Sequence, residues 1–180
     1  MTRKERADFI LYDMGLLKEL ERYGKPHPIG SYRMDMMAWN DLDIDIENDE
    51  MSLERLHGLT AYVLKTFRPV WYEAKEEVTD EGNTVWFHGF EAVIDGELWN
   101  LDLWFFNRET IARAESHCDW VVNNTGAAER EAIVALKREL IARKLYGFDK
   151  YHSMQVYEAV IEKHIMTVDG FLEAYHRTDW

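Results

Sequence analysis

Cysteine is almost absent from this chain, whose 180 residues include a single one, Cys118. One cysteine cannot close an internal disulfide, and such usage is typical of proteins in a reducing compartment. Residues 2–8 are too charged for a signal peptide, and no apolar run has the length of a membrane span. We therefore expect a cytoplasmic protein that does not interact with a membrane.

Positive charge is also scarce, because 21 lysines and arginines stand against 34 aspartates and glutamates, for a net charge of −13. Binding to long nucleic acids draws most of its affinity from lysine and arginine contacts with phosphates. A surface of this sign repels a polyanion, so long nucleic acid is not expected as a partner. A small anion remains compatible with the sequence if a metal ion and a few local cations offset the field.

The chain has enough apolar residues for one ordinary folded core. Hydrophobic residues make up 47% of it, and seven tryptophans, nine tyrosines and eight phenylalanines exclude a disordered tail. Periodicity predicts helices over 4–23, 52–67 and 127–146, one or two more within 153–176, and strands through 70–106 with a turn at 80–83. We predict a single α+β domain, 1–180, with a core over 1–118 and a helical C-terminal part over 119–180.

The segment that follows Gly30 and Ser31 alternates strictly between acidic and apolar residues. Asp41, Asp43 and Asp45 fall on one side of the pattern, and Leu42, Ile44 and Ile46 fall on the other. This is the period of a half-buried strand, so the pattern predicts a row of carboxylates on one face of a sheet.

A second strand pair is predicted around Asp95-Gly96, a dipeptide that favours a two-residue type I′ hairpin turn. This turn pairs Trp99 with Ala92 and Asp102 with Gly89. Asp102 then lies on a polar face, and an aspartate in so apolar a strand is costly unless it is paired or binds a metal. Asp102 is therefore the third carboxylate expected near the acidic strand.

These three carboxylates suit a divalent cation. Asp41 and Asp43 are two strand steps apart, which separates their Cα atoms by roughly 6–7 Å and lets both side chains converge on Mg²⁺. A third carboxylate from a neighbouring strand completes a site for one or two ions. Gly30 permits close backbone approach, and Ser31 offers a hydroxyl for a phosphate oxygen.

Gly30-Ser31, the Asp41-Leu42-Asp43 triplet and the later Asp102 together resemble the signature of the DNA polymerase beta-like nucleotidyltransferase superfamily. The similarity is closest to its small bacterial members, such as aminoglycoside and lincosamide nucleotidyltransferases, and covers about residues 27–106. It implies a mixed sheet flanked by helices, in a nucleotidyltransferase-like core, with a helical C-terminal extension.

The resemblance also implies an activity, in which a nucleoside monophosphate passes from a nucleoside triphosphate to a hydroxyl group of a small molecule. Asp41, Asp43 and Asp102 would be the catalytic, Mg²⁺-binding carboxylates. Gly30, Ser31, Arg33 and Lys137 would bind the nucleotide. The protein would act as a monomer or homodimer.

Three alternatives remain open. Asp43 and Asp45 fit the acid-apolar-acid pattern almost as well as Asp41 and Asp43. The chain also fits a non-catalytic nucleotidyltransferase-like protein, either a toxin-neutralising partner or a nucleotide sensor, and an unrelated acidic metal-binding domain.

In the helix predicted over 127–146, Arg130, Lys137 and Lys144 recur every seventh residue. This stripe fits a phosphate-binding face less well than an ordinary solvated one.

Overall fold

The computed structural model describes residues 1–79, 82–147 and 149–175. The chain divides into two compact units, Met1–Cys118 and Asp119–Trp180. Residues 80 and 81 of the predicted turn lie outside the described residues. Within the described part of the chain, no helix is both long and apolar enough to span a membrane.

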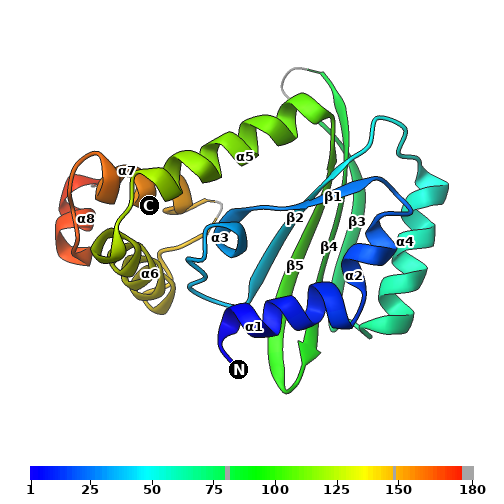
Figure 1. Ribbon diagram of the computed structural model, residues 1–180, viewed down its shortest axis with the longest axis horizontal. Helices are drawn as coiled ribbons and strands as arrows, with labels where there is room; N and C mark the ends of the chain where they lie inside the picture. The colour runs from blue at the N-terminus through cyan, green and yellow to red at the C-terminus, as the bar shows by residue number, and fades with distance from the viewer. Residues whose placement is uncertain (80–81, 148, 176–180) are drawn as a thin grey trace. The chain divides into compact units, whose positions relative to one another are not determined.

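The first unit is built on a five-stranded mixed sheet (Figure 1). Its strands are β1 (Lys25–Pro28), β2 (Asp41–Glu47), β3 (Trp71–Val78), β4 (Thr84–Ile94) and β5 (Glu97–Phe106). They follow the order β1-β2-β5-β4-β3, and β2 and β5 run parallel while the other neighbours are antiparallel. The predicted acidic strand is confirmed as β2, which lies between β1 and β5.

The predicted hairpin is confirmed with its register. Asp95 and Gly96 both have positive φ, 50° and 79°, as a type I′ turn requires. Trp99 pairs with Ala92, and Asp102 pairs with Gly89. The alternate residues Trp99, Leu101, Leu103 and Phe105 of β5 are therefore buried on one face. Asn100 and Asp102 lie on the other face, which also carries Trp104.

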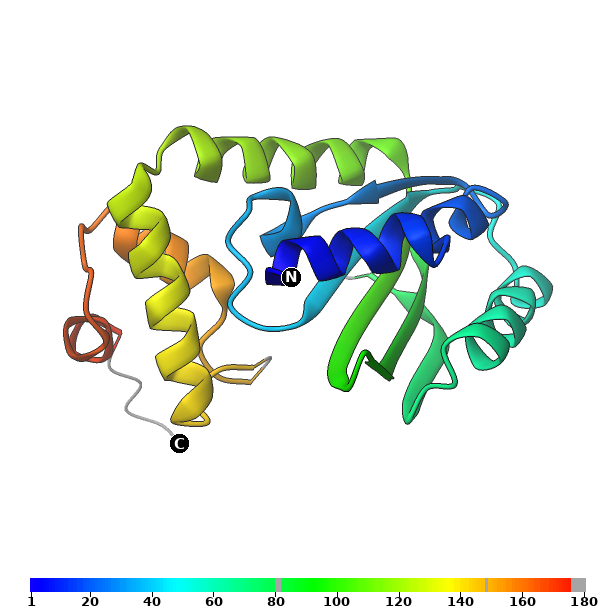
Figure 2. The same cartoon turned by 60° about the horizontal axis from the view of Figure 1, so that its bottom comes forward.

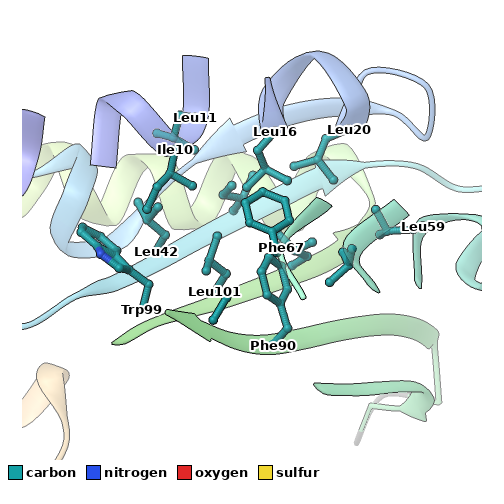
Figure 3. Close-up of a cluster of buried hydrophobic side chains, with 14 of the residues drawn as sticks. Ile10, Leu11, Leu16, Leu20, Leu42, Leu59, Phe67, Phe90, Trp99 and Leu101 are labelled. Carbon is teal, nitrogen blue, oxygen red and sulfur yellow. The ribbon is translucent and has the colours of Figure 1, made fainter. Parts of the chain in front are cut away.

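Three N-terminal segments and one long helix cover the apolar face of this sheet. They are α1 (Arg3–Asp8), the π-helical η1 (Phe9–Asp13), α2 (Leu16–Leu20) and α4 (Leu53–Thr66), the last of which is capped by Ser52. Figure 3 shows the resulting core, in which Leu11, Leu42 and Phe90 come from different elements. The hydrophobic face of the sheet is thereby removed from water.

The prediction of one continuous helix over 4–23 was wrong. The chain passes through a π-helical segment and then breaks at Gly15, whose φ of +79° is left-handed. The break shifts the helical phase, so Leu16 is fully buried whereas Leu17 is only half-buried. Glycine tolerates this conformation because it has no Cβ.

A helix that the sequence did not predict, α5 (Arg108–Asn123), follows β5. Few of its side chains are buried, among them Ile111, Cys118 and Val121. Helix prediction relies on a dense apolar stripe, and this helix is mostly charged or polar. It begins in the first unit and ends in the second.

The second unit contains three further helices, α6 (Ala127–Ala142), α7 (Ser153–Ile161) and α8 (Val168–Ala174), and α6 packs against α7 (Figure 2). The helix predicted over 127–146 ends earlier, because Lys144 has a left-handed φ of 59°. Lys144 therefore does not continue the predicted stripe. Lys137 is not solvated either, since it is only 1% exposed and donates to the Tyr157 hydroxyl at 2.7 Å.

His88 is fully buried on the apolar face of β4, beside the Tyr72 and Phe90 rings. Burial disfavours the charged imidazolium and lowers the pKa of His88 to about 4.

We predict that the contribution of His88 to the free energy of unfolding falls as the pH drops from about 6.5 to 4, because the unfolded chain binds a proton that folded His88 resists. This contribution should approach a loss of about 3 kcal/mol. Denaturant unfolding at several pH values should show it as a difference in slope between the wild type and His88→Leu. His57→Leu, at an exposed histidine of α4, is the control and should retain the slope. An equal slope in wild type and His88→Leu would contradict this prediction.

Candidate metal and nucleotide site

Gly30 and Ser31 begin a short helix, α3 (Gly30–Arg33), that follows β1 and leans on β2. The amide of Ile29 donates to the Asp43 carbonyl at 3.0 Å, which fixes the start of this helix beside the acidic strand. Gly30 has a φ of +61°, and a Cβ there would overlap the Asp43 carboxylate. A glycine is therefore required both by the backbone and by the nearby carboxylate.

The parallel pairing of β2 with β5 brings three carboxylates together. Asp43 lies directly opposite Asp102, and Asp41 lies opposite Asn100. One oxygen from each of Asp41, Asp43 and Asp102 lies within 4.8 Å of the other two. Of the two pairs that the sequence left open, the structure groups Asp41 and Asp43 with Asp102.

Gly89 supports Asp102 from the opposite strand. A Cβ at Gly89 would lie 3.1 Å from Asp102 Oδ1 and closer still to the Phe87 ring. The Asp102 carboxylate and the Phe87 ring therefore occupy the space beside Gly89. Asp43 and Asp102 thus each lie against a glycine.

The charge of the cluster is only partly compensated by hydrogen bonds. Asn100 Nδ2 donates to Asp41 Oδ1 at 2.8 Å. Burial, and then the negative charge of Asp41, raise the pKa of Asp102 to about 6. The protein therefore holds a carboxylate in a place where its charged form is disfavoured.

These residues fit a hard divalent cation such as Mg²⁺. The donors are all carboxylate oxygens, which Mg²⁺ prefers, and they come from two adjacent strands. A cation would also relieve the repulsion that raises the pKa of Asp102. Asp41, Asp43 and Asp102 are the residues that would hold it.

Asp45 has a different environment from the other two acids of β2. It is 3% exposed, and burial, followed by the charge of Glu115, raises its pKa to about 7. It pairs with His27 of β1 and Trp104 of β5. Asp45 is therefore a buried neighbour of the carboxylate cluster.

The other residues predicted to bind the nucleotide lie in both units. Ser31 and Arg33 belong to α3, and an Arg33 Nη1 group donates to Glu115 Oε1 at 3.2 Å. Lys137 belongs to the second unit, and its role toward a nucleotide stays a prediction. Glu115 itself had no signal in the sequence, because nothing predicted the helix that carries it.

The cluster does not line the cavity of about 620 Å³ at the carboxyl ends of β2 and β5. Trp86, Phe106, Asn107 and Arg113 line that cavity among others. The three carboxylates lie instead on the sheet face opposite the hydrophobic core, beside α3.

No family model and no curated protein matches this chain. Solved structures do match it. The Cid1 poly(U) polymerase, in a form with Mg 3′-dATP bound, is 15% identical with a TM-score of 0.59, over 91% of this chain and 51% of that one. The polymerase core of TRAMP, an RNA surveillance complex, is 16% identical with a TM-score of 0.62, over 97% and 59%. A cytoplasmic RNA terminal U-transferase is 16% identical with a TM-score of 0.59, over 92% and 50%.

The chain has the α+β fold of these polymerases, a mixed sheet flanked by helices, as its resemblance to the DNA polymerase beta-like nucleotidyltransferase superfamily predicted. It spans about half the length of the solved structures that it matches. Its placement among the small bacterial members stays a prediction.

Gly30→Ala should lower the free energy of unfolding by more than the cost of placing an alanine at a positive φ. We expect a loss of about 2–4 kcal/mol, because the methyl group adds the clash with Asp43 to the cost of the positive φ. Gly96→Ala is the matched control, since Gly96 has a φ of +79° with nothing within 4 Å of an added Cβ. It should lose about 1 kcal/mol. Equal losses in urea unfolding would mean that Asp43 does not require the glycine.

Asp102→Asn should stabilise the protein in the absence of metal. At pH 7.5 the substitution removes a buried charge, and the gain should be about 1–3 kcal/mol. The folded pKa of about 6 lies above the ordinary value of 3.8, so wild-type stability rises as the pH falls through 6 and the advantage of the variant shrinks by pH 5. Denaturant unfolding in EDTA at both pH values measures this, and an advantage that is unchanged at pH 5 would contradict it.

Proposed function

We propose that the chain is a Mg²⁺-dependent nucleotidyltransferase, which moves a nucleoside monophosphate from a nucleoside triphosphate to a hydroxyl group. The single observation that carries this proposal is the convergence of Asp41, Asp43 and Asp102 beside the Gly30-Ser31 helix. The fold shared with nucleotidyltransferases supports it.

The reaction is an in-line displacement. The acceptor oxygen forms a bond to the α-phosphorus, the bond to the β-phosphate oxygen breaks, and pyrophosphate leaves. Asp102 accepts the hydroxyl proton. Mg²⁺, when bound by the three aspartates, supplies positive charge that offsets the negative charge of the phosphates. Gly30, Ser31 and Arg33 bind the nucleotide's phosphates in this proposal.

Two classes of acceptor are each supported by one observation. The net charge of −13 favours a small hydroxylated molecule over a polyanion. The poly(U) polymerase and the RNA terminal U-transferase that share the fold favour the terminal hydroxyl of an RNA. Both acceptors would meet the same carboxylate cluster, so the transfer chemistry does not depend on the choice.

Thermal unfolding with each of the four nucleoside triphosphates and Mg²⁺ should show stabilisation by at least one of them. A ligand at a hundred times its dissociation constant adds about 2.7 kcal/mol. Asp43→Ala should abolish this gain. Asp49→Ala, which removes an exposed carboxylate just beyond β2, is the control and should retain it.

The nucleotide that stabilises the protein is then assayed for pyrophosphate release, with a panel of aminoglycosides and with a short RNA as acceptors. Release that depends on one acceptor and is lost in Asp43→Ala supports transfer to that class. Binding without release for any acceptor favours the non-catalytic nucleotide sensor. No stabilisation by any metal–nucleotide pair would overturn the proposed function.

A further inference from the structure

Glu115 of α5 contacts residues on both sides of the Gly30-Ser31 segment. Its Oε1 atom lies 3.1 Å from His27 Nδ1, three residues before Gly30. The same oxygen accepts from Arg33 Nη1 at 3.2 Å, two residues after Ser31. One carboxylate therefore ties the strand that leads into the segment to the helix that ends it.

The contact between Glu115 and His27 is partly removed from water. The His27 side chain is 12% exposed and the Glu115 side chain is 31% exposed, and the other ring nitrogen of His27 lies 3.6 Å from Glu47 Oε2. A partly desolvated pair is screened less by water and salt than an exposed one.

The other side of the segment is held by α1. Tyr32 donates its hydroxyl proton to Asp8 Oδ1 at 2.7 Å, and Lys4 Nζ donates to the Tyr32 carbonyl at 3.1 Å. α3 is only four residues long, so its own backbone bonds are few. Its position therefore depends on these side-chain contacts, from α1 on one side and from Glu115 on the other.

We infer that Glu115 is a positioning residue for the nucleotide's phosphates, an inference that rests on the proposed function. Glu115 acts through His27 and Arg33, which hold Gly30 and Ser31 at a fixed distance from Asp43. Its carboxylate also orients the Arg33 guanidinium through the bond from Nη1. Loss of Glu115 lets the segment move and weakens its contacts with the phosphates.

The first measurement is amide hydrogen exchange of the metal-free, nucleotide-free protein. Glu115→Ala should speed exchange about tenfold at the amides of Ile29, Met34 and Met36, which bond to Asp43, Gly30 and Ser31. The amides of β4 and β5 should not change. Glu109→Ala is the matched control, because Glu109 lies on the same helix but is 82% exposed and pairs with Arg113.

The second measurement is steady-state kinetics with the preferred nucleotide. Glu115→Ala should raise the KM for the nucleoside triphosphate about tenfold and leave kcat within about twofold. Glu115→Gln retains an oxygen that accepts from both donors and should recover most of the affinity. A purely structural role would lower the active fraction, and with it the apparent kcat, without changing KM.

The outcomes separate the two proposals. If exchange at the Gly30-Ser31 segment is the same in wild type and Glu115→Ala, the positioning role is overturned, whatever the wild type binds. A fall in kcat with an unchanged KM overturns it as well. If exchange does quicken but the wild type binds no nucleotide, the proposed function fails while the anchoring of the segment by Glu115 stands.

Discussion

The parallel pairing of β2 with β5 is the constraint on which the site depends. It places Asp43 opposite Asp102 and Asp41 opposite Asn100, so like charges meet in the middle of a sheet. The alternate residues of the same strands are fully buried on the other face, Leu42 and Leu101 among them. Each such side chain contributes about 1.5–3 kcal/mol, so several of them together exceed a repulsion of about 4 kcal/mol for each contact pair of carboxylates. Burial of the apolar face thus stabilises the strand pair against the repulsion on its acidic face.

The site requires the glycines beside the carboxylates as well as the carboxylates themselves. Gly30 and Gly89 lie against Asp43 and Asp102, and neither position accepts a Cβ without a collision. Glu115 holds the segment that carries Gly30, although it lies more than seventy residues further along the chain. The residues that set the geometry of the cluster therefore come from α3, β2, β4, β5 and α5, and no single sequence motif contains them all.

Much of this arrangement was predictable, for physical reasons that differ between elements. Strict alternation identified β2, and Asp95-Gly96 fixed the register of β4 and β5, because both signals are local. The pairing of β2 with β5 is not local, so Asp102 was brought to the acidic strand only by the cost of an unpaired aspartate in an apolar strand and by the family resemblance. The break at Gly15 was missed since an apolar pattern does not reveal a phase shift. α5 was missed because its buried stripe is sparse, and with it the contacts of Glu115 with His27 and Arg33.

The order of the strands also determines when the carboxylates can meet during folding. β4 and β5 are joined by a two-residue turn and can pair early, whereas the Asp41–Asn100 contact closes a separation of 59 residues. The like charges are therefore brought together late, after the hairpin is formed. A cation that binds the finished cluster would act mainly by slowing unfolding, and it would do little to speed the folding of the chain.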